Sequence, residues 1–337
     1  MYSARLRQPR TAAVAVASLL VLSAAAPALA TADTTGKPAV AAAHHRSALP
    51  TSYTIPGSKT YPEGIARQHG TPYFYVGSTT DGTIYRGDVH QPETKVFVPG
   101  GEDGRTSVAG MKTDPAGRLI VAGGATGKVF VYDTRTRDLL HVFDTGRTDG
   151  FLNDVALAPN GDVYISDSTH PALWRITAAQ LKSKAVRQPL QVGADLSHSP
   201  IDYNAGFNGN GLVVTENGRY VLLSDYNDYA FYRIDIHTHA VVPIDLCGAQ
   251  GVSGDGMLLH GNTLYAVTEQ DHPEGQISIL KLSDDFTRAR VVRTLHDHGM
   301  HSPSTAAFDG HDLLIVNFQF QIAEPQLPFN VVRVPVR

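Results

Sequence analysis

The chain has 337 residues, a formal net charge of −4 at pH 7 and a single cysteine. The slightly acidic charge argues against nucleic-acid or anionic-membrane binding as the main role. One cysteine excludes an internal disulfide, and we expect Cys247 to be a small buried side chain.

Residues 1–30 have the three parts of a secretory signal peptide. Arg5, Arg7 and Arg10 form a basic region. Residues 12–23 form an apolar run that is too short to span a bilayer, and Ala30 ends a small-x-small cleavage site. We therefore expect cleavage after Ala30 and a secreted, extracellular protein.

The sequence after this segment divides into a leader and one large domain. Residues 31–49 are expected to be a disordered leader, and residues 50–337 the folded domain. Without the three arginines of the signal peptide, 25 basic residues face 32 acidic ones, a formal charge of −7. No second apolar segment is long enough for a membrane span.

A short motif recurs six times, and each copy leads into an apolar strand, a turn and a second strand. Successive motifs begin 46, 44, 57, 45 and 49 residues apart. A period in the forties built of strands is typical of a β-propeller with one blade per repeat. We therefore predict an all-β fold, a six-bladed β-propeller. The motifs are Glu63-Gly64-Ile65-Ala66, Ala109-Gly110-Met111-Lys112, Asn153-Asp154-Val155-Ala156, Asn210-Gly211-Leu212-Val213, Asp255-Gly256-Met257-Leu258 and Ser304-Thr305-Ala306-Ala307.

The second strands of the repeats are rich in β-branched and aromatic residues, as in Tyr73-Phe74-Tyr75-Val76. Asn-Gly pairs such as Asn160-Gly161 precede several of them and suit turns with positive φ. The long third interval holds the one helix-like stretch, Ala178 to Ala185. The strand near residues 52–55 is expected to pair with residues 330–334, which would close the ring and remove two exposed edges.

Equivalent positions of different blades meet at one end of a propeller's central channel. Four motif openings carry an oxygen ligand there: Glu63, Asn153, Asn210 and Asp255. Singly, a carboxylate at a strand start is usually solvated and an Asn-Gly pair is usually a turn. Their shared blade position instead predicts a site for one hard divalent cation. The other two openings carry no ligand, which leaves room for a substrate.

The ligand types also bear on which cation would bind. Oxygen ligands make Ca²⁺ the first choice, with Mg²⁺ or Mn²⁺ second. No histidine occupies an equivalent position, so Zn²⁺ is a weaker candidate and Cu²⁺ is disfavoured. Asp154 is expected either to hydrogen-bond to a ligand or to cap the strand turn.

The motifs Pro62-Glu63-Gly64, Asn153-Asp154, Asn210-Gly211-Leu212 and Gly254-Asp255-Gly256-Met257 resemble those of the gluconolactonase, regucalcin and senescence-marker family. A more distant resemblance extends to paraoxonase and diisopropyl fluorophosphatase. The resemblance spans residues 61–320 and implies a six-bladed propeller with one catalytic divalent cation at the channel mouth. It implies that Glu63, Asn210 and Asp255 bind the metal, that Asn153 contacts metal or substrate, and that Asp255 is the candidate base.

Phe151 departs from the family pattern. Sugar-lactone members carry an arginine two residues before the asparagine that matches Asn153, so a guanidinium clamp for hydroxyl groups is missing here. Phe151 would instead offer the substrate an apolar wall, which favours a more hydrophobic lactone or ester. His301 precedes the sixth inner strand and is either a substrate-binding proton shuttle at the channel mouth or part of a solvated loop.

Two functional hypotheses follow from these residues. The first is a metal-dependent hydrolase of a lactone or ester, with Asp255 as base or as nucleophile. The second is a non-catalytic extracellular binding protein whose metal is structural, because propellers often serve as binding platforms. The expected partner is a small molecule, with no nucleic acid or membrane, and a propeller of this size can be a monomer.

Overall fold

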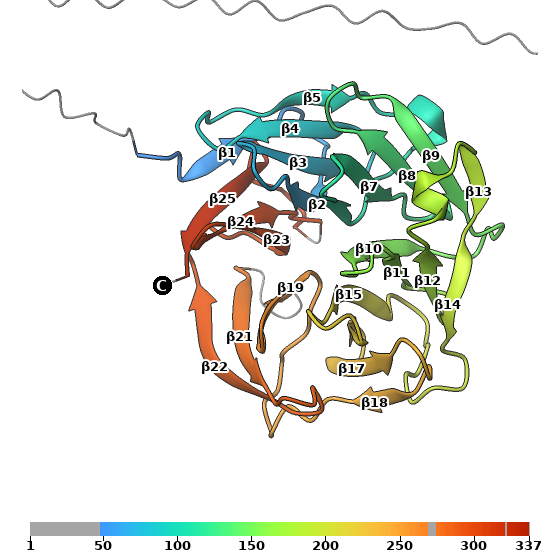
Figure 1. The fold of residues 1–337 in the computed structure, drawn as a ribbon. Helices are drawn as coiled ribbons and strands as arrows, with labels where there is room; N and C mark the ends of the chain where they lie inside the picture. The colour runs from blue at the N-terminus through green and yellow to red at the C-terminus, as the bar shows by residue number, and fades with distance from the viewer. Residues whose placement is uncertain (1–47, 269–273, 321, 337) are drawn as a thin grey trace, which may run out of the picture. The chain divides into compact units, whose positions relative to one another are not determined.

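The computed structural model of the chain describes residues 48–268, 274–320 and 322–336. In these residues 25 strands form six sheets, and two 3₁₀ turns, η1 (Glu102–Gly104) and η2 (Gln180–Lys182), are the other regular elements. The sheets stand in a ring around a common centre (Figure 1), so the predicted six-bladed, all-β propeller is confirmed. The predicted signal peptide, and the predicted leader up to residue 47, lie outside the described residues.

Each blade contains four antiparallel strands in meander order, with the first strand of its repeat innermost. Blade 1 contains β2 (Pro62–Arg67), β3 (Tyr73–Ser78), β4 (Ile84–Asp88) and β5 (Lys95–Val98). Blade 2 contains β6 (Met111–Thr113), β7 (Arg118–Ala122), β8 (Lys128–Asp133) and β9 (Leu139–Asp144). Blade 3 contains β10 (Leu152–Leu157), β11 (Val163–Asp167), β12 (Ala172–Ile176) and β14 (Gln191–Asp195). Blade 4 contains β15 (Gly209–Val214), β16 (Tyr220–Asp225), β17 (Ala230–Asp235) and β18 (Val241–Pro243). Blade 5 contains β19 (Met257–His260), β20 (Thr263–Thr268), β21 (Gln276–Leu282) and β22 (Ala289–His296). Blade 6 contains β23 (Pro303–Asp309), β24 (Asp312–Asn317), β25 (Asn330–Pro335) and β1 (Ser52–Thr54).

The hydrophobic core lies between the blades rather than at the centre of the ring. Six clusters of buried side chains are present in the described part of the chain, and each combines residues of two neighbouring blades. A blade is therefore buried on both faces, which explains why its second strand is a continuous apolar run instead of an alternating one. β16, for example, is buried at all six of its positions.

The ring closes through its first and last strands, as predicted. β1 pairs antiparallel with β25, with Ser52 opposite Val332 and Thr54 opposite Asn330. The expected turns are also present, since Gly161 and Gly218 have φ of +86° and +68°. No helix among the described residues is long and apolar enough to cross a membrane.

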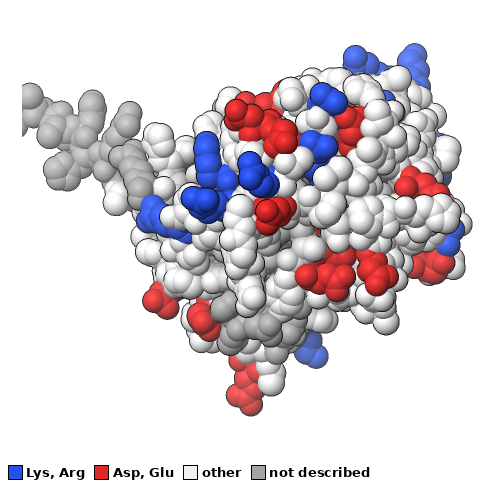
Figure 2. All heavy atoms as spheres, turned by 90° about the horizontal axis from the view of Figure 1, so that it is seen from below, with Lys and Arg blue, Asp and Glu red and all other residues white. Residues whose placement is uncertain are grey.

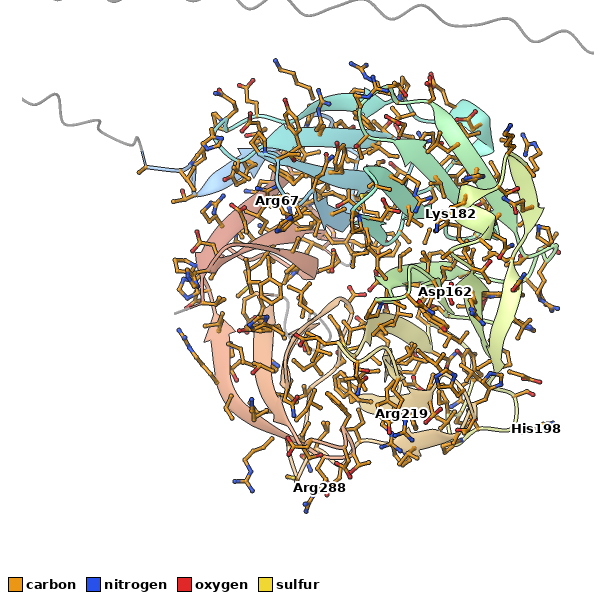
Figure 3. All side chains as sticks on the ribbon, viewed as in Figure 1. Arg67, Asp162, Lys182, His198, Arg219 and Arg288 are labelled. Atoms are coloured by element: carbon orange, nitrogen blue, oxygen red, sulfur yellow. The ribbon has the colours of Figure 1, made fainter. Side chains whose placement is uncertain are left out.

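A charged network reinforces the closure where the last blade meets the first. Asp309 Oδ1 accepts from Arg67 Nε at 2.8 Å, and Asp309 Oδ2 accepts from Arg333 at 2.7 Å. Arg333 also binds Asp312 Oδ2 at 2.8 Å and the Tyr53 hydroxyl at 2.8 Å. Figure 3 shows Arg67 at this junction. The carboxylate of Asp309 thus joins blade 1 to blade 6.

The helix-like stretch Ala178 to Ala185 was a wrong prediction. It contains only η2, and the chain then forms β13 (Arg187–Pro189), which pairs in parallel with β9 of blade 2. The insertion therefore gives blade 2 a fifth strand, and Leu181 packs into the core between blades 2 and 3. Sheet pairing outweighs the local helix propensity here.

The predicted burial of Cys247 was also wrong. Its side chain is exposed, and its backbone has φ of +54°. Cys247 N donates to Asp245 Oδ1 at 2.8 Å, which is a turn stabilised by an aspartate.

Candidate metal and substrate site

Four of the six inner strands open with a β-bulge. In four blades the pairing register shifts at the motif, so that two residues face one on the second strand. The shifts fall between Pro62 and Ile65, Leu152 and Val155, Gly209 and Leu212, and Pro303 and Ala306. Bulges re-aim a side chain, and here they contain three of the four predicted ligands, Glu63, Asn153 and Asn210.

The glycine that follows several openings allows neighbouring blades to touch. A Cβ on Gly64 would lie 2.0 Å from Ala109 O, and one on Gly211 would lie 2.5 Å from Asp255 O. Both contacts are with the backbone of the next blade, so no side chain can be accommodated. The Asn210-Gly211 pair is not a turn, because it lies within β15.

The openings lead into one pocket of about 300 Å³. All six blades contribute to it, either from just before or within an inner strand or from just after a second strand. Its lining residues are Glu63, Thr79, Thr80, Ser107, Phe151, Asn153, Phe207, Asn210, Tyr226, Asp255, Phe318 and Phe320. The structure therefore brings the four predicted metal ligands together with Phe151, while their roles remain predictions.

Asn210 and Asp255 are linked across two blades. Asn210 Nδ2 lies 2.9 Å from Asp255 Oδ1. An ionised carboxylate only accepts hydrogen bonds, so the amide nitrogen of Asn210 must face Asp255. The amide oxygen then faces the other way.

Asn153 is oriented by a chain of two hydrogen bonds. Ser168 Oγ donates to the carbonyl oxygen of Gly209 at 2.8 Å, because a carbonyl can only accept. Its hydroxyl hydrogen is used there, so Ser168 Oγ must accept from Asn153 Nδ2, which lies 2.9 Å away. This fixes the amide of Asn153 with its nitrogen on Ser168 and its oxygen on the opposite side.

Both amide oxygens are buried without a hydrogen-bond partner. Asn153 Oδ1 and Asn210 Oδ1 have no hydrogen-bond partner, and each residue is 4 % exposed. Glu63 and Asp255 are 9 % and 8 % exposed in the same pocket. Two amide oxygens and two carboxylates are the donor set that Ca²⁺ accepts, so these residues fit a hard divalent cation.

Other parts of the described chain offer no stronger metal site. No cluster of three or more His, Cys, Asp or Glu side chains that could hold a metal occurs among the described residues. The four candidate ligands do not form such a cluster because two of them, Asn153 and Asn210, are asparagines. The signal for it lies in the repeat positions rather than in the acidic residues.

Aromatic side chains form much of the pocket wall. Phe151 and Phe207 meet edge to face with ring centroids 5.0 Å apart. Phe318 and Phe320 stack with centroids 5.2 Å apart and an interplanar angle of 11°. Only Phe151 was predicted. The other three lie in loops next to strands, where no local sequence pattern distinguishes them.

Two other predicted residues lie apart from this pocket. His301 is half-buried, and its backbone nitrogen donates to Asn317 Oδ1 at 2.9 Å, but it is not among the described residues that line the pocket. Asp154 connects blades instead, because it accepts from Val155 N at 2.8 Å and from Lys112 Nζ and Leu212 N at 3.4 Å each.

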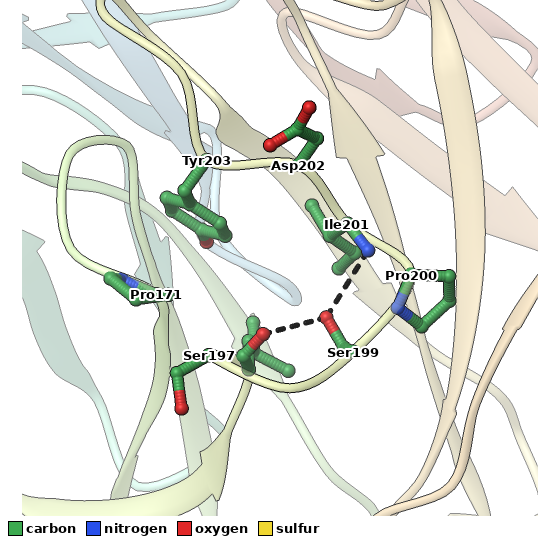
Figure 4. Close-up of a pocket in the computed structure, with 8 residues that line it drawn as sticks. Pro171, Ser197, Ser199, Pro200, Ile201, Asp202 and Tyr203 are labelled. Atoms are coloured by element: carbon green, nitrogen blue, oxygen red, sulfur yellow. Dashed lines mark hydrogen bonds between the residues drawn. The ribbon is translucent and has the colours of Figure 1, made fainter.

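Two larger cavities have less suitable linings. One of about 410 Å³ lies beside the loop of residues 196–203, where Ser199 Oγ donates to Leu196 O (Figure 4). Another of about 600 Å³ lies on the outer part of blade 1. Neither contains a buried polar atom without a partner. Size alone therefore does not identify the site.

The sequence matches no protein-family model and has no significant match among curated proteins. Three solved structures resemble the chain in fold. The allergen Mala s 1 of Malassezia sympodialis has a TM-score of 0.61 at 13% identity, covering 85% of this chain and 96% of that one. Regucalcin of Agrobacterium tumefaciens, a calcium-binding protein, has 0.60 at 12%, covering 86% and 96%. A provisionally assigned gluconolactonase has 0.57 at 13%, covering 84% and 91%. The predicted resemblance to gluconolactonase and regucalcin is thus confirmed at the level of the fold.

Proposed function

We propose that this protein is a secreted hydrolase that uses one divalent cation, Ca²⁺ first among the candidates, to cleave a lactone or ester. The observation that carries the proposal is the pair of orphaned amide oxygens, Asn153 Oδ1 and Asn210 Oδ1, in a pocket with two carboxylates. A buried polar atom without a partner costs about 1–3 kcal/mol. Coordination of a cation would remove that cost at both atoms.

The four ligands would then divide the work. Glu63 and Asp255 would neutralise the cation, while Asn153 and Asn210 would add neutral oxygens. A bound cation would polarise the carbonyl oxygen of the substrate and stabilise its developing negative charge. Asn210 Nδ2 holds Asp255 in a fixed orientation at 2.9 Å.

Asp255 is the candidate catalytic residue. As a base it takes a proton from water, the water oxygen adds to the carbonyl carbon, the C–O bond to the leaving alcohol breaks, and the proton held by Asp255 passes to the leaving oxygen. The products are a carboxylic acid and an alcohol, or one hydroxy acid from a lactone. As a nucleophile it would attack the carbonyl carbon itself, the C–O bond to the alcohol would break with the alcohol oxygen taking a proton from water, and a second water would then hydrolyse the acyl–aspartate anhydride.

The proposed substrate is a small molecule with apolar parts. A pocket of about 300 Å³ lies at the small end of the usual range for ligand sites, which is about 300–1,000 Å³. Phe151 stands where the resemblance would place an arginine, so hydroxylated sugar lactones lack their cationic partner. The absence of a nucleic-acid partner remains an expectation, and the face in Figure 2, where acidic and basic side chains are interspersed, supports it.

The test is hydrolysis of a panel of lactones and esters by the mature protein. Activity is measured as purified, after removal of metal with EDTA, and after return of Ca²⁺, Mg²⁺ or Mn²⁺. Asp255→Asn is measured beside Asp138→Asn, because Asp138 is an exposed aspartate on the outer β8–β9 turn. We expect activity to be lost with the metal, to return with one cation, and to be absent only in Asp255→Asn.

Thermal unfolding of the same samples separates the two hypotheses. A cation that binds only the folded state raises stability by about 2.7 kcal/mol at a concentration 100 times its dissociation constant. Stabilisation with turnover supports the hydrolase. Stabilisation without turnover across the panel would indicate the binding protein with a structural metal, and no stabilisation by any cation would contradict the metal site.

A further inference from the structure

We propose that the pocket selects substrates that carry a planar aromatic ring, held between the Phe151–Phe207 pair and the Phe318–Phe320 pair. The inference rests on the proposed function and specifies its substrate class. The two pairs come from opposite sides of the propeller. Phe151 and Phe207 precede the inner strands of blades 3 and 4, and Phe318 and Phe320 follow β24 of blade 6, across the ring in Figure 1.

In the first pair, Phe151 is held in place by its surroundings. Phe151 N donates to Asp167 Oδ1 at 2.9 Å, and Asp167 is fully buried. The Phe151 ring lies against Gly124, where an added Cβ would be only 3.3 Å from it. Phe207 meets this ring edge to face at 83° and is 43 % exposed. One ring of the pair is therefore fixed, and the other is open to solvent.

The second pair is positioned by Gln319, the buried residue that lies between Phe318 and Phe320 in the sequence. Gln319 has φ of +57° and is 2 % exposed, and its side chain exchanges hydrogen bonds of 2.7 and 3.1 Å with the backbone of Gln326. Phe318 N and Gln319 N both donate to Ser302 O at 3.1 Å. The rings are nearly parallel, and Phe320 is 60 % exposed. A preformed aromatic surface of this kind costs little entropy when a ligand binds.

Exposed aromatic rings beside a metal-type site require an explanation. A phenyl ring in water is unfavourable, and exposed apolar groups gathered at a pocket commonly mark a binding surface. Rings prefer other rings in stacked or edge-to-face contact, which contributes beyond simple area burial. The charged residues among the described lining are two carboxylates, Glu63 and Asp255, and no basic side chain is there to bind a polyol or an anionic tail. The wall thus favours an aromatic substituent over a hydroxylated one.

A matched pair of esters isolates the ring. Ethyl 3-phenylpropanoate and ethyl 3-cyclohexylpropanoate have the same leaving group and the same carbons next to the carbonyl, and they differ in ring planarity. We expect kcat/KM for the phenyl ester to exceed that of the cyclohexyl ester by about two- to tenfold. Phe320→Leu should bring this ratio close to one, and Phe320→Tyr, which keeps the ring, should retain it. Phe320 is exposed, so neither variant should unfold the protein.

Binding of the corresponding amides, 3-phenylpropanamide and 3-cyclohexylpropanamide, is measured by calorimetry on the calcium-loaded protein. Tighter binding of the phenyl amide without ester hydrolysis would support the aromatic site while contradicting the hydrolase. Hydrolysis with equal kcat/KM for the two esters, or a preference for a hydroxylated sugar lactone, would overturn the aromatic inference and leave the hydrolase standing. Equal binding of both amides by a protein with no turnover would contradict both proposals.

Discussion

Asn210 donates a hydrogen bond of 2.9 Å to Asp255 although the two residues belong to different blades and lie 45 positions apart. The bond turns the amide oxygen of Asn210 away from the carboxylate, and that oxygen is left buried without a partner. Asn153 is turned in the same sense by Ser168. Two independent hydrogen-bond networks thus prepare amide oxygens for a ligand, which is the pre-organisation that a binding site needs.

Ser168→Ala should weaken calcium binding while leaving all four proposed ligands in place. Ser168 is not itself a proposed ligand. Its hydroxyl oxygen accepts a hydrogen bond from Asn153 Nδ2 at 2.9 Å and donates one to Gly209 O. Losing a residue that orients a metal ligand typically lowers affinity about 10- to 100-fold. Calorimetric titration with Ca²⁺ measures the change, and Ser197→Ala, on the exposed loop, is the control. Equal affinities in both variants would contradict the orienting role.

Gly211→Ala should destabilise the propeller by about 2–3 kcal/mol. The new Cβ would lie 2.5 Å from Asp255 O and 2.8 Å from Gly254 O, and both atoms belong to the backbone of the next blade. Gly70→Ala is the comparison, because its Cβ would meet nothing within 4 Å and only its φ of +75° is unfavourable. Urea unfolding gives both free energies. A smaller loss at Gly211 than at Gly70 would show that blade contact is not the constraint.

Asp309→Asn should weaken the ring closure. Its two oxygens accept from Arg67 and Arg333 at 2.8 and 2.7 Å, and the Arg333 side chain is only 7% exposed. Breaking one partner of a buried ion pair costs about 3–5 kcal/mol, and the partial exposure of Asp309, at 14%, reduces this to about 2–3 kcal/mol. Urea unfolding measures the loss. Asp149→Asn removes the exposed Asp149–Arg147 pair instead and should leave stability nearly unchanged, because water screens this pair.

The features of the fold that recur in every blade could be predicted from the sequence. Blade number, ring closure by β1 and β25, and the residues at the blade openings all follow from a period in the forties, because equivalent positions of a ring share an environment. The bulge at four of the openings was not predicted, since it depends on how two strands pair.

Features without a repeat were missed. Phe318 and Phe320 lie in a loop whose path is set by the hydrogen bonds between Gln319 and Gln326, which no local pattern signals. The stretch Ala178 to Ala185 has helical propensity, but its neighbouring segment gains more by pairing with β9. The orientation of Asn153 depends on Ser168 and on Gly209 in another blade.

Asp225→Asn should stabilise the protein at neutral pH. Asp225 occupies in blade 4 the place that Asp167 has in blade 3, but its two oxygens are buried without a well-formed hydrogen bond, and the backbone amides of Asn227 and Asp228 only partly offset the cost of burial. Burial, and then the charge of Asp228, raise the pKa of Asp225 to about 6. By contrast, Asp167 accepts from Phe151 N at 2.9 Å and from Trp174 Nε1 at 3.1 Å.

The sign of the pH effect follows from the raised pKa. The folded state holds the proton of Asp225 up to about pH 6, whereas the unfolded chain releases it near the ordinary aspartate pKa of 3.8. The contribution to stability is therefore complete below pH 3.8 and is lost as the pH rises to about 6. Asp225→Asn stays neutral, so its advantage should be absent at pH 3.5 and reach about 1–2 kcal/mol at pH 7.5, after allowance for solvent screening. Urea unfolding at both pH values measures it, and Asp167→Asn, which removes a satisfied acceptor, should lose stability at pH 7.5. Parallel pH profiles for wild type and Asp225→Asn would mean that a cation or another donor already satisfies this carboxylate.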